Sequence, residues 1–233
     1  MSEAGSHPSM AELAALIADI QRRSMNTEAG LAELVDSASR LVSGADYAGI
    51  TLVRESSEVS SLAATHRYAE VLDEIQQRHG DGPCLTAAWT HHMVRIDDLS
   101  AEQRWQRFRE DVMAETPVRS VLSYEMFVSD KVMGALNFYA DRPNAFGDDS
   151  EETGFVFAAN IALAWAMLRR DEEFRSALAS RDVIGQAKGM LMERFGIDAV
   201  QAFELLRRLS QDSNVKLAEV ARQVIAAERP RQE

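Results

Sequence analysis

Apolar residues follow two different periods along the first part of the chain. Residues 10–23 and 27–44 carry apolar side chains three and four positions apart, which predicts two helices, the second of which stops at Gly44. The pattern then changes to β-like runs at 47–53 and 59–66. The chain is therefore expected to begin with helices and to continue into a sheet.

Further helical and strand patterns alternate after these two strands. In chain order they predict a helix, a short helix, a strand, a helix and two strongly apolar strands, at 68–80, 80–90, 92–99, 101–115, 118–128 and 131–140. Hairpin strands beside segregated helices are typical of an α+β domain. We expect a mostly antiparallel sheet that is flanked by helices.

Only helical patterns occur from Asp148 onward. The first of them has no clear stop before about Phe195, which predicts a helix of about 48 residues and about 72 Å. Its stretch Phe155–Leu168 is apolar enough to pack on the sheet or on a second chain. Residues 169–182 resemble a solvated helical connector that could form a short coiled coil.

The end of the chain predicts an all-α three-helix bundle. Gly196 separates the long helix from a second helix, and Asp198 with Gln201 resembles a capping box. The expected apolar faces of the last two helices are Ala199, Ala202, Phe203, Leu206 and Leu209, and Leu217, Val220, Ala221, Val224 and Ile225. So small a bundle buries little surface alone, so support from the long helix or from a dimer is expected.

These patterns divide the chain into four segments. They are an N-terminal leader and helix at 1–24, the sheet domain at 25–160, a helical connector at 161–178 and the C-terminal bundle at 179–230. Residues 1–9 are expected to be a disordered leader.

The charge of the chain follows a similar division. The net charge is −12, but residues 181–233 carry a net +1 and the first 180 residues a net −13. An acidic front half does not suit a polyanionic partner, whereas a nearly neutral tail with clustered arginines could bind one locally.

Composition and the termini favour a cytoplasmic protein. Cys84 is the only cysteine, so no intrachain disulfide can form, which fits a reducing compartment. The N-terminus has no basic segment before its apolar part, unlike a signal peptide. The longest apolar stretch, 155–168, has 14 residues and is too short for a membrane span, which needs about 18.

Two sequence segments carry a resemblance to known families. The segment Ile184–Ile225 contains an AKG-LM core, an AF-LLR-LS helix and a KLAEVA helix. Together these resemble the ANTAR domain, an RNA-binding module of bacterial transcription antiterminators. The segment GDGPCLTAAWTHHMVRIDDL, followed by RWQRF, is similar to the GAF domains that are joined to ANTAR domains in actinobacteria.

The resemblance implies a mechanism. ANTAR domains bind two adjacent RNA stem-loops with six-base loops, one loop for each domain of a dimer, and the RNA fold held in this way prevents a terminator hairpin. Many relatives are controlled by a phosphorylated receiver domain. A GAF-like domain takes that place here, so we expect control through this domain, which could hold a small-molecule ligand that the sequence does not identify.

Two glycines, Gly185 and Gly189, lie inside the predicted long helix, although each costs about 1 kcal/mol relative to alanine. Glycine permits close approach of another backbone, and RNA loops with unstacked bases need shallow surfaces beside cations. With the resemblance, this indicates six RNA-binding candidates: Lys188, Gly189, Met192, Arg207, Arg208 and Lys216. A second interpretation stays open, in which the glycines let helices pack closely and Met192 belongs to the core.

Four residues within fourteen positions could suggest a metal or haem: His79, Cys84, His91 and His92. They lack the paired spacing of a zinc site, and adjacent residues on a strand point to opposite faces. We therefore expect a buried cysteine and turn histidines, with a redox-sensing thiol as the lesser alternative, and no metal or cofactor ligands.

No catalytic residues are predicted. Asp97 and Asp98 lie where a strand ends and a helix is about to begin, and the chain has no P-loop, G-x-S-x-G or H-E-x-x-H pattern. Trp105, Phe108 and Val112 share a helix face and are expected in the core.

The leading hypothesis is an RNA-binding antiterminator that is controlled by a sensory domain and is not an enzyme. A homodimer is expected, with residues 10–40 and 150–175 in its interface. The alternatives are a DNA-binding regulator with a C-terminal helical reading unit and an enzyme that acts on a small molecule in the sheet domain. Neither terminal helix has the dense row of Arg, Asn and Gln that would read base edges in DNA.

Overall fold

A computed structural model of the protein describes residues 10–24, 27–54, 58–90, 93–129 and 132–227. The chain divides into two compact units, Met1–Leu168 and Arg169–Glu233, and the helix α6 (Asp148–Phe195) has residues in both. Its 48 residues confirm the long helix expected from the sequence. The predicted leader at 1–9 lies outside the described residues.

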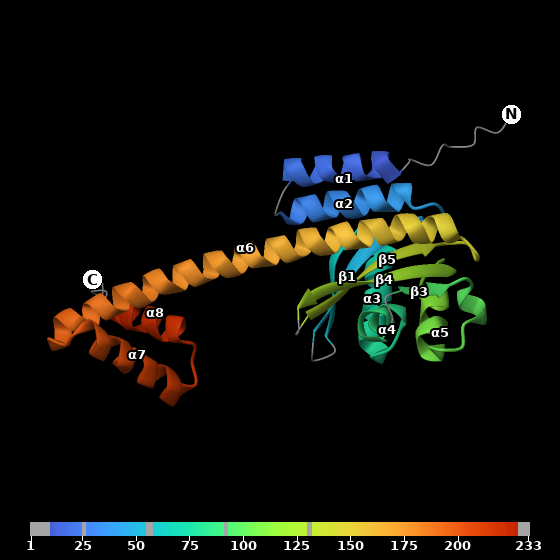
Figure 1. Cartoon of the computed structure of the whole chain (residues 1–233). Coiled ribbons are helices and arrows are strands. Elements are labelled where there is room, and N and C mark those ends of the chain that lie inside the picture. Colours follow the sequence, from blue (N-terminus) through green and yellow to red (C-terminus); the bar gives the residue numbers. More distant parts are fainter. Residues whose placement is uncertain (1–9, 25–26, 55–57, 91–92, 130–131, 228–233) are drawn as a thin grey trace, which may run out of the picture. The chain divides into compact units, whose positions relative to one another are not determined.

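The first unit combines five strands with helices (Figure 1). In chain order its elements before α6 are α1 (Met10–Ser24), α2 (Glu28–Leu41), β1 (Tyr47–Arg54), β2 (Val59–Ala64), α3 (Arg67–His79), α4 (Pro83–Thr90), β3 (Met93–Ile96), the 3₁₀ helix η1 (Leu99–Ala101), α5 (Gln106–Glu115), β4 (Ser120–Ser129) and β5 (Val132–Ala140). The strand order is β2-β1-β5-β4-β3, and every neighbouring pair is antiparallel. The α+β fold with a mostly antiparallel sheet is thus confirmed.

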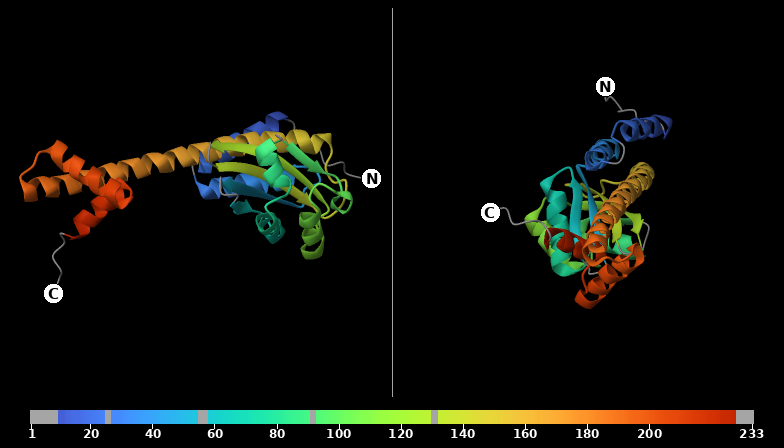
Figure 2. Two further views of the ribbon diagram at one scale, coloured as in Figure 1. Left: turned by 90° about the horizontal axis from the view of Figure 1, so that it is seen from below. Right: turned by 90° about the vertical axis from the view of Figure 1, so that its left-hand side faces the viewer.

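Helices cover both faces of this sheet (Figures 1 and 2). The helix α2 and the first part of α6 lie on one face, with α1 packed on the outside of α2, and α3, α4 and α5 lie on the other face. Each face has its own apolar cluster. The sheet is therefore the middle layer between these two cores, and side chains of opposite parity along the three inner strands enter different cores.

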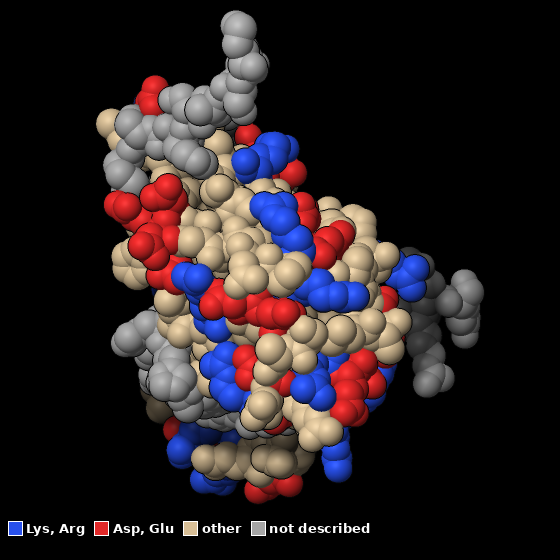
Figure 3. All heavy atoms as spheres, turned by 90° about the vertical axis from the view of Figure 1, so that its right-hand side faces the viewer, with Lys and Arg blue, Asp and Glu red and all other residues tan. Residues whose placement is uncertain are grey.

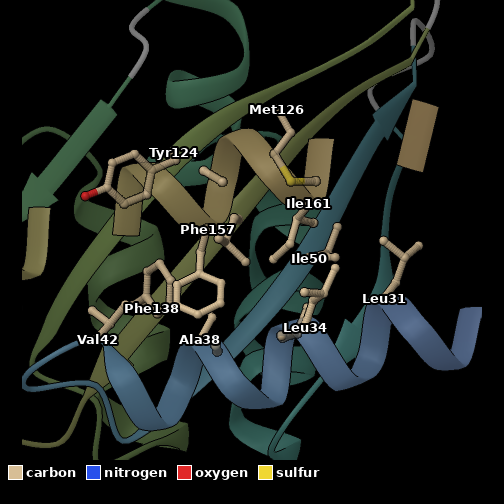
Figure 4. Packing of buried hydrophobic residues seen from close by; sticks show 14 of the residues in the cluster. Leu31, Leu34, Ala38, Val42, Ile50, Tyr124, Met126, Phe138, Phe157 and Ile161 are labelled. Atoms are coloured by element: carbon tan, nitrogen blue, oxygen red, sulfur yellow. The ribbon is translucent and has the colours of Figure 1, made fainter. Parts of the chain in front are cut away.

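The first core lies between the sheet, α2 and α6 (Figure 4). Alternating strand residues such as Ile50 and Phe138 meet Leu34 of α2 and Phe157 and Ile161 of α6. The period of two on the strands and of about four on the helices explains why these side chains share one layer. Each such fully buried side chain stabilises the fold by about 1.5–3 kcal/mol.

The second core lies under α3, α4 and α5. Trp105, Phe108 and Val112 are buried there, as the sequence predicts. The helix α3 ends at His79 and is capped by Gly80, whose φ of 64° suits glycine, and α4 begins at Pro83. The helix α2, in contrast, ends at Leu41 rather than at Gly44, because the backbone is already extended at Val42, with φ of −75° and ψ of 112°.

The second unit contains the rest of α6, α7 (Ala199–Ser213) and α8 (Leu217–Ala227). The predicted capping box is present, since Asp198 accepts hydrogen bonds from the first turn of α7 and the Gln201 side chain bonds back to it. The prediction for one apolar face was partly wrong: Ala199 is exposed, and so are Phe203 and Leu209, by 37% and 42%. The short helices α7 and α8 and the end of α6 cover only a narrow side of one another, so the flanks of each apolar stripe stay open.

No described helix is long and apolar enough to cross a membrane.

Candidate nucleic-acid interface

Four residues near the end of α6 share one side of this helix. Successive helical residues turn by about 100°, so Gly185, Lys188, Gly189 and Met192 together span about 100° of the helix surface. Both glycines are exposed, Lys188 is half-buried, and Met192 is half-buried against the core of the second unit. We call these four residues the glycine face.

The two glycines do not serve helix packing within the described chain. A Cβ atom added to Gly185 or Gly189 would have no heavy atom within 4 Å. The interpretation that these glycines let neighbouring helices of this unit approach is therefore wrong. The backbone of the glycine face is instead open to a partner from outside the chain.

The remaining candidates differ in their electrostatic partners. Arg207, Arg208 and Lys216 are all exposed. The guanidinium of Arg207 is held by Glu204, with Nη2–Oε2 at 2.6 Å and Nε–Oε2 at 3.1 Å. Among the described residues, no carboxylate pairs with Lys188, Arg208 or Lys216. Those three cations are the ones that remain available to phosphate.

Elsewhere positive and negative side chains are mixed. Figure 3 shows Lys and Arg interspersed with Asp and Glu on one face of the molecule. In the first unit, Arg78 pairs with Asp111 and Glu115, and Arg95 pairs with Asp97 and Glu151. Such paired charges offer a polyanion little net attraction.

A hollow of about 320 Å³ on α7 was not predicted from the sequence. It is lined by Ile197, Gln201, Glu204, Leu205 and Arg208. The last four residues are spaced by three, four and seven positions, so the helical period places them on one side of α7. That spacing was visible in the sequence, but nothing in it distinguished a hollow from an ordinary solvated face.

A buried carboxylate in the first unit was also missed. Asp73 of α3 is only 6% exposed, and it accepts hydrogen bonds from the hydroxyls of Thr51, at 2.6 Å, and Ser61. Asn137 in turn donates to Thr51 at 2.8 Å. Burial raises the pKa of Asp73 to about 6, although the Ser61 and Thr51 hydroxyls act to lower it. The charge of Glu70 adds to the rise.

The raised pKa of Asp73 predicts how stability depends on pH. A carboxyl whose folded pKa is about 6 instead of 3.8 stabilises the fold while it is protonated, and this stabilisation is lost as pH rises from 3.8 through 6. Relative to Asp73→Asn, the wild-type protein should therefore lose roughly 2–3 kcal/mol of unfolding free energy between pH 4 and pH 7. Urea unfolding at several pH values measures this difference.

The exposed Glu74 on the same helix supplies a matched control for that experiment. Glu74→Gln should follow the wild-type pH profile closely. A constant difference between wild type and Asp73→Asn across this pH range would show that Asp73 titrates normally.

Cys84 of α4 is fully buried. Its Sγ accepts a hydrogen bond from Gln76 Nε2 at 3.0 Å, and burial, followed by the charge of Asp73, raises its pKa to about 12. A thiol in this state is a poor nucleophile. His79 does not join it, because its Nε2 lies 2.8 Å from Asp111 Oδ2.

The predicted histidine pair, His91 and His92, lies outside the described residues. Across the described part of the chain, no group of three or more His, Cys, Asp or Glu side chains could hold a metal ion. Two hollows in the first unit could admit a small molecule. One, of about 500 Å³, lies between α2 and β2, and the other, of about 310 Å³, lies between β2 and α3 beside Asp73.

Comparisons with known proteins give a family for each part of the chain. The GAF domain family matches residues 24–166, which is more than half of the chain, and the ANTAR domain family matches residues 172–225. A search of curated proteins found no match.

Solved structures resemble the first unit. The GAF domain of an Acinetobacter phosphoenolpyruvate-protein phosphotransferase is 17% identical, with a TM-score of 0.54, and the match covers 73% of this chain and 97% of that one. The free methionine-R-sulfoxide reductase of Neisseria meningitidis is 15% identical, with a TM-score of 0.52 and coverage of 69% and 92%. A phycoerythrobilin-bound GAF domain from a cyanobacterial phytochrome is also 15% identical, with a TM-score of 0.52 and coverage of 70% and 97%.

At these identities the likeness shows the fold alone. The family matches and the fold agree on the same order of domains along the sequence, first GAF and then ANTAR. The chain belongs to the proteins that join a GAF domain to a C-terminal ANTAR domain.

Proposed function

We propose that this protein binds paired six-base-loop RNA stem-loops through its ANTAR domain and prevents transcription termination under the control of its GAF domain. The observation that carries the proposal is the glycine face, an open backbone surface beside Lys188 within the ANTAR match. Unstacked loop bases need a shallow surface, and the phosphates that flank them need cations. Arg208 and Lys216 add two such cations from the rest of the unit.

A homodimer is part of the proposal. In the first unit, α6 leaves Phe155, Leu163 and Met167 exposed by 64%, 52% and 45%. Steps of eight and four residues place these three side chains within about 120° of one another on the helix. An exposed apolar stripe of this kind favours burial against a second copy of the chain. The proposed RNA target gives a separate reason for a dimer, since two stem-loops require two ANTAR domains.

The proposal is tested with the full-length protein and three nucleic acids. We expect it to bind an RNA with two six-base-loop stem-loops, to bind a scrambled RNA of equal length much more weakly, and to show no preference for duplex DNA that encodes the same sequence. In single-round transcription, it should increase passage through a terminator that overlaps the second stem-loop. Equal affinity for all three nucleic acids would rule out loop recognition, and preference for the duplex would favour the DNA-binding alternative.

A further inference from the structure

The hollow on α7 combines an apolar floor with polar groups at its rim. Ile197 and Leu205 are half-buried and pack against the core of the second unit, so they form the floor. Gln201, Glu204 and Arg208 complete its lining. Its volume of about 320 Å³ lies at the lower end of small-molecule sites.

Each rim group has hydrogen-bonding capacity that the described residues leave unused. Gln201 Oε1 accepts from the backbone N–H of Asp198 at 3.1 Å, which fixes the side chain and leaves its amide N–H groups to donate. Both bonds from Arg207 reach Glu204 Oε2, so Oε1 of this carboxylate has no partner within the described chain. Arg208 likewise pairs with no described carboxylate.

A fixed acceptor, a fixed donor and a cation around an apolar floor match the chemistry of a nucleotide. The floor suits the flat face of a base, and a carboxylate accepts from an exocyclic amino group. An amide donor suits a ring nitrogen or carbonyl on the same base edge, and a guanidinium suits the adjoining phosphate. An apolar binding patch would need only the floor, and an anion site would need only the cation, so the combination favours a nucleotide.

We propose that this hollow binds one unstacked, amino-bearing base of an RNA loop, with Glu204 and Gln201 on its edge and Arg208 on its phosphate. The inference rests on the proposed function, because it assigns a base site within the same RNA complex. It also gives the Arg207–Glu204 ion pair a positioning role, since Arg207 holds the carboxylate at the rim. Arg207 then acts through Glu204 rather than on the RNA itself.

The test pairs protein variants with RNAs that lack one base. Abasic nucleotides are placed singly along both six-base loops, and the affinity of the full-length protein is measured for each RNA. For wild type, one loop position should cost about tenfold or more in affinity. In Glu204→Gln and in Arg208→Gln, the same abasic position should cost less than about threefold, because the site that held this base is already impaired.

Arg222→Gln is the matched control. Arg222 is an exposed arginine of α8 that pairs with Glu219, outside the hollow. In this variant, every abasic penalty should equal the wild-type value. Circular dichroism and melting temperatures establish that all the variants are folded.

The outcomes separate this inference from the proposed function. If wild type binds the intact RNA but every abasic penalty is unchanged in both hollow variants, the hollow holds no base and the inference is overturned, while RNA binding stands. If wild type does not distinguish the two-stem-loop RNA from its scrambled control, the proposed function itself fails.

Discussion

Gly189→Leu should bind the two-stem-loop RNA about a hundredfold more weakly than wild type, while its helices melt no earlier. The loss corresponds to about 3 kcal/mol, the upper range for one displaced base contact. Leucine has a better helix propensity than glycine by almost 1 kcal/mol, and a Cβ at this position meets no atom of the chain. The leucine side chain would therefore contact no other part of the chain and would occupy only the space that the bound RNA loop needs.

Gln186→Leu is the matched control for this substitution. Gln186 is exposed on the same helix and lies outside the glycine face, about 160° around the helix from Lys188 and about 60° from Gly189. Its RNA affinity should stay within about twofold of wild type. Normal binding by Gly189→Leu would exclude the glycine face as the recognition surface, whereas a lower melting temperature would show that the glycine serves packing after all.

Lys188→Ala separates charge from shape at the same surface. It should weaken binding less than Gly189→Leu, and the slope of log affinity against log salt should flatten by about 0.7, the value for one phosphate contact on a single strand. A lower affinity with an unchanged salt slope would mean that Lys188 contacts no phosphate.

Leu163→Glu combined with Met167→Glu should convert the protein from a dimer to a monomer. The two side chains are already half exposed, so glutamate is tolerated in a single chain, but an apolar interface would have to bury two charges from each copy. Sedimentation equilibrium should give about twice 25.9 kDa for wild type and 25.9 kDa for the variant.

RNA binding supplies a second measurement for the same variant. Affinity for the two-stem-loop RNA should fall by about a hundredfold or more, because the second loop no longer binds within one complex. Affinity for a single stem-loop should be unchanged. Gln103→Glu with Ala114→Glu adds the same charge at exposed positions just before and within α5, which packs on the other face of the sheet, and should stay dimeric. A wild-type protein that is monomeric both alone and with RNA would contradict the proposed assembly.

Local patterns were sufficient to predict the architecture. The change of apolar period near Tyr47 predicted where the first strand begins. The absence of any helix stop before Phe195 predicted how far α6 extends. The capping box at Asp198 was readable because its two partners are only three residues apart. Periodicity, helix stops and capping boxes involve residues that are close in sequence, and such residues are also close in the folded structure.

Contacts between distant elements could not be predicted in this way. Asp73 in an otherwise amphipathic helix is expected to face solvent, yet it is buried against Thr51, 22 positions away. Among the RNA-binding candidates, the sequence ranked Arg207 and Arg208 alike, and only the geometry shows that Glu204 holds one of them. The open space beside Gly189 likewise depends on where α7 and α8 lie, which no local period determines.

The sheet also bears on how copies of this chain can associate. Its two edge strands, β2 and β3, are its shortest, with six and four residues against eight to ten for the inner three. The pairing of β2 is further interrupted by a register shift opposite Ile50 and Thr51. Short and irregular edges are poor templates for adding another strand, so edge-to-edge aggregation of this sheet is disfavoured.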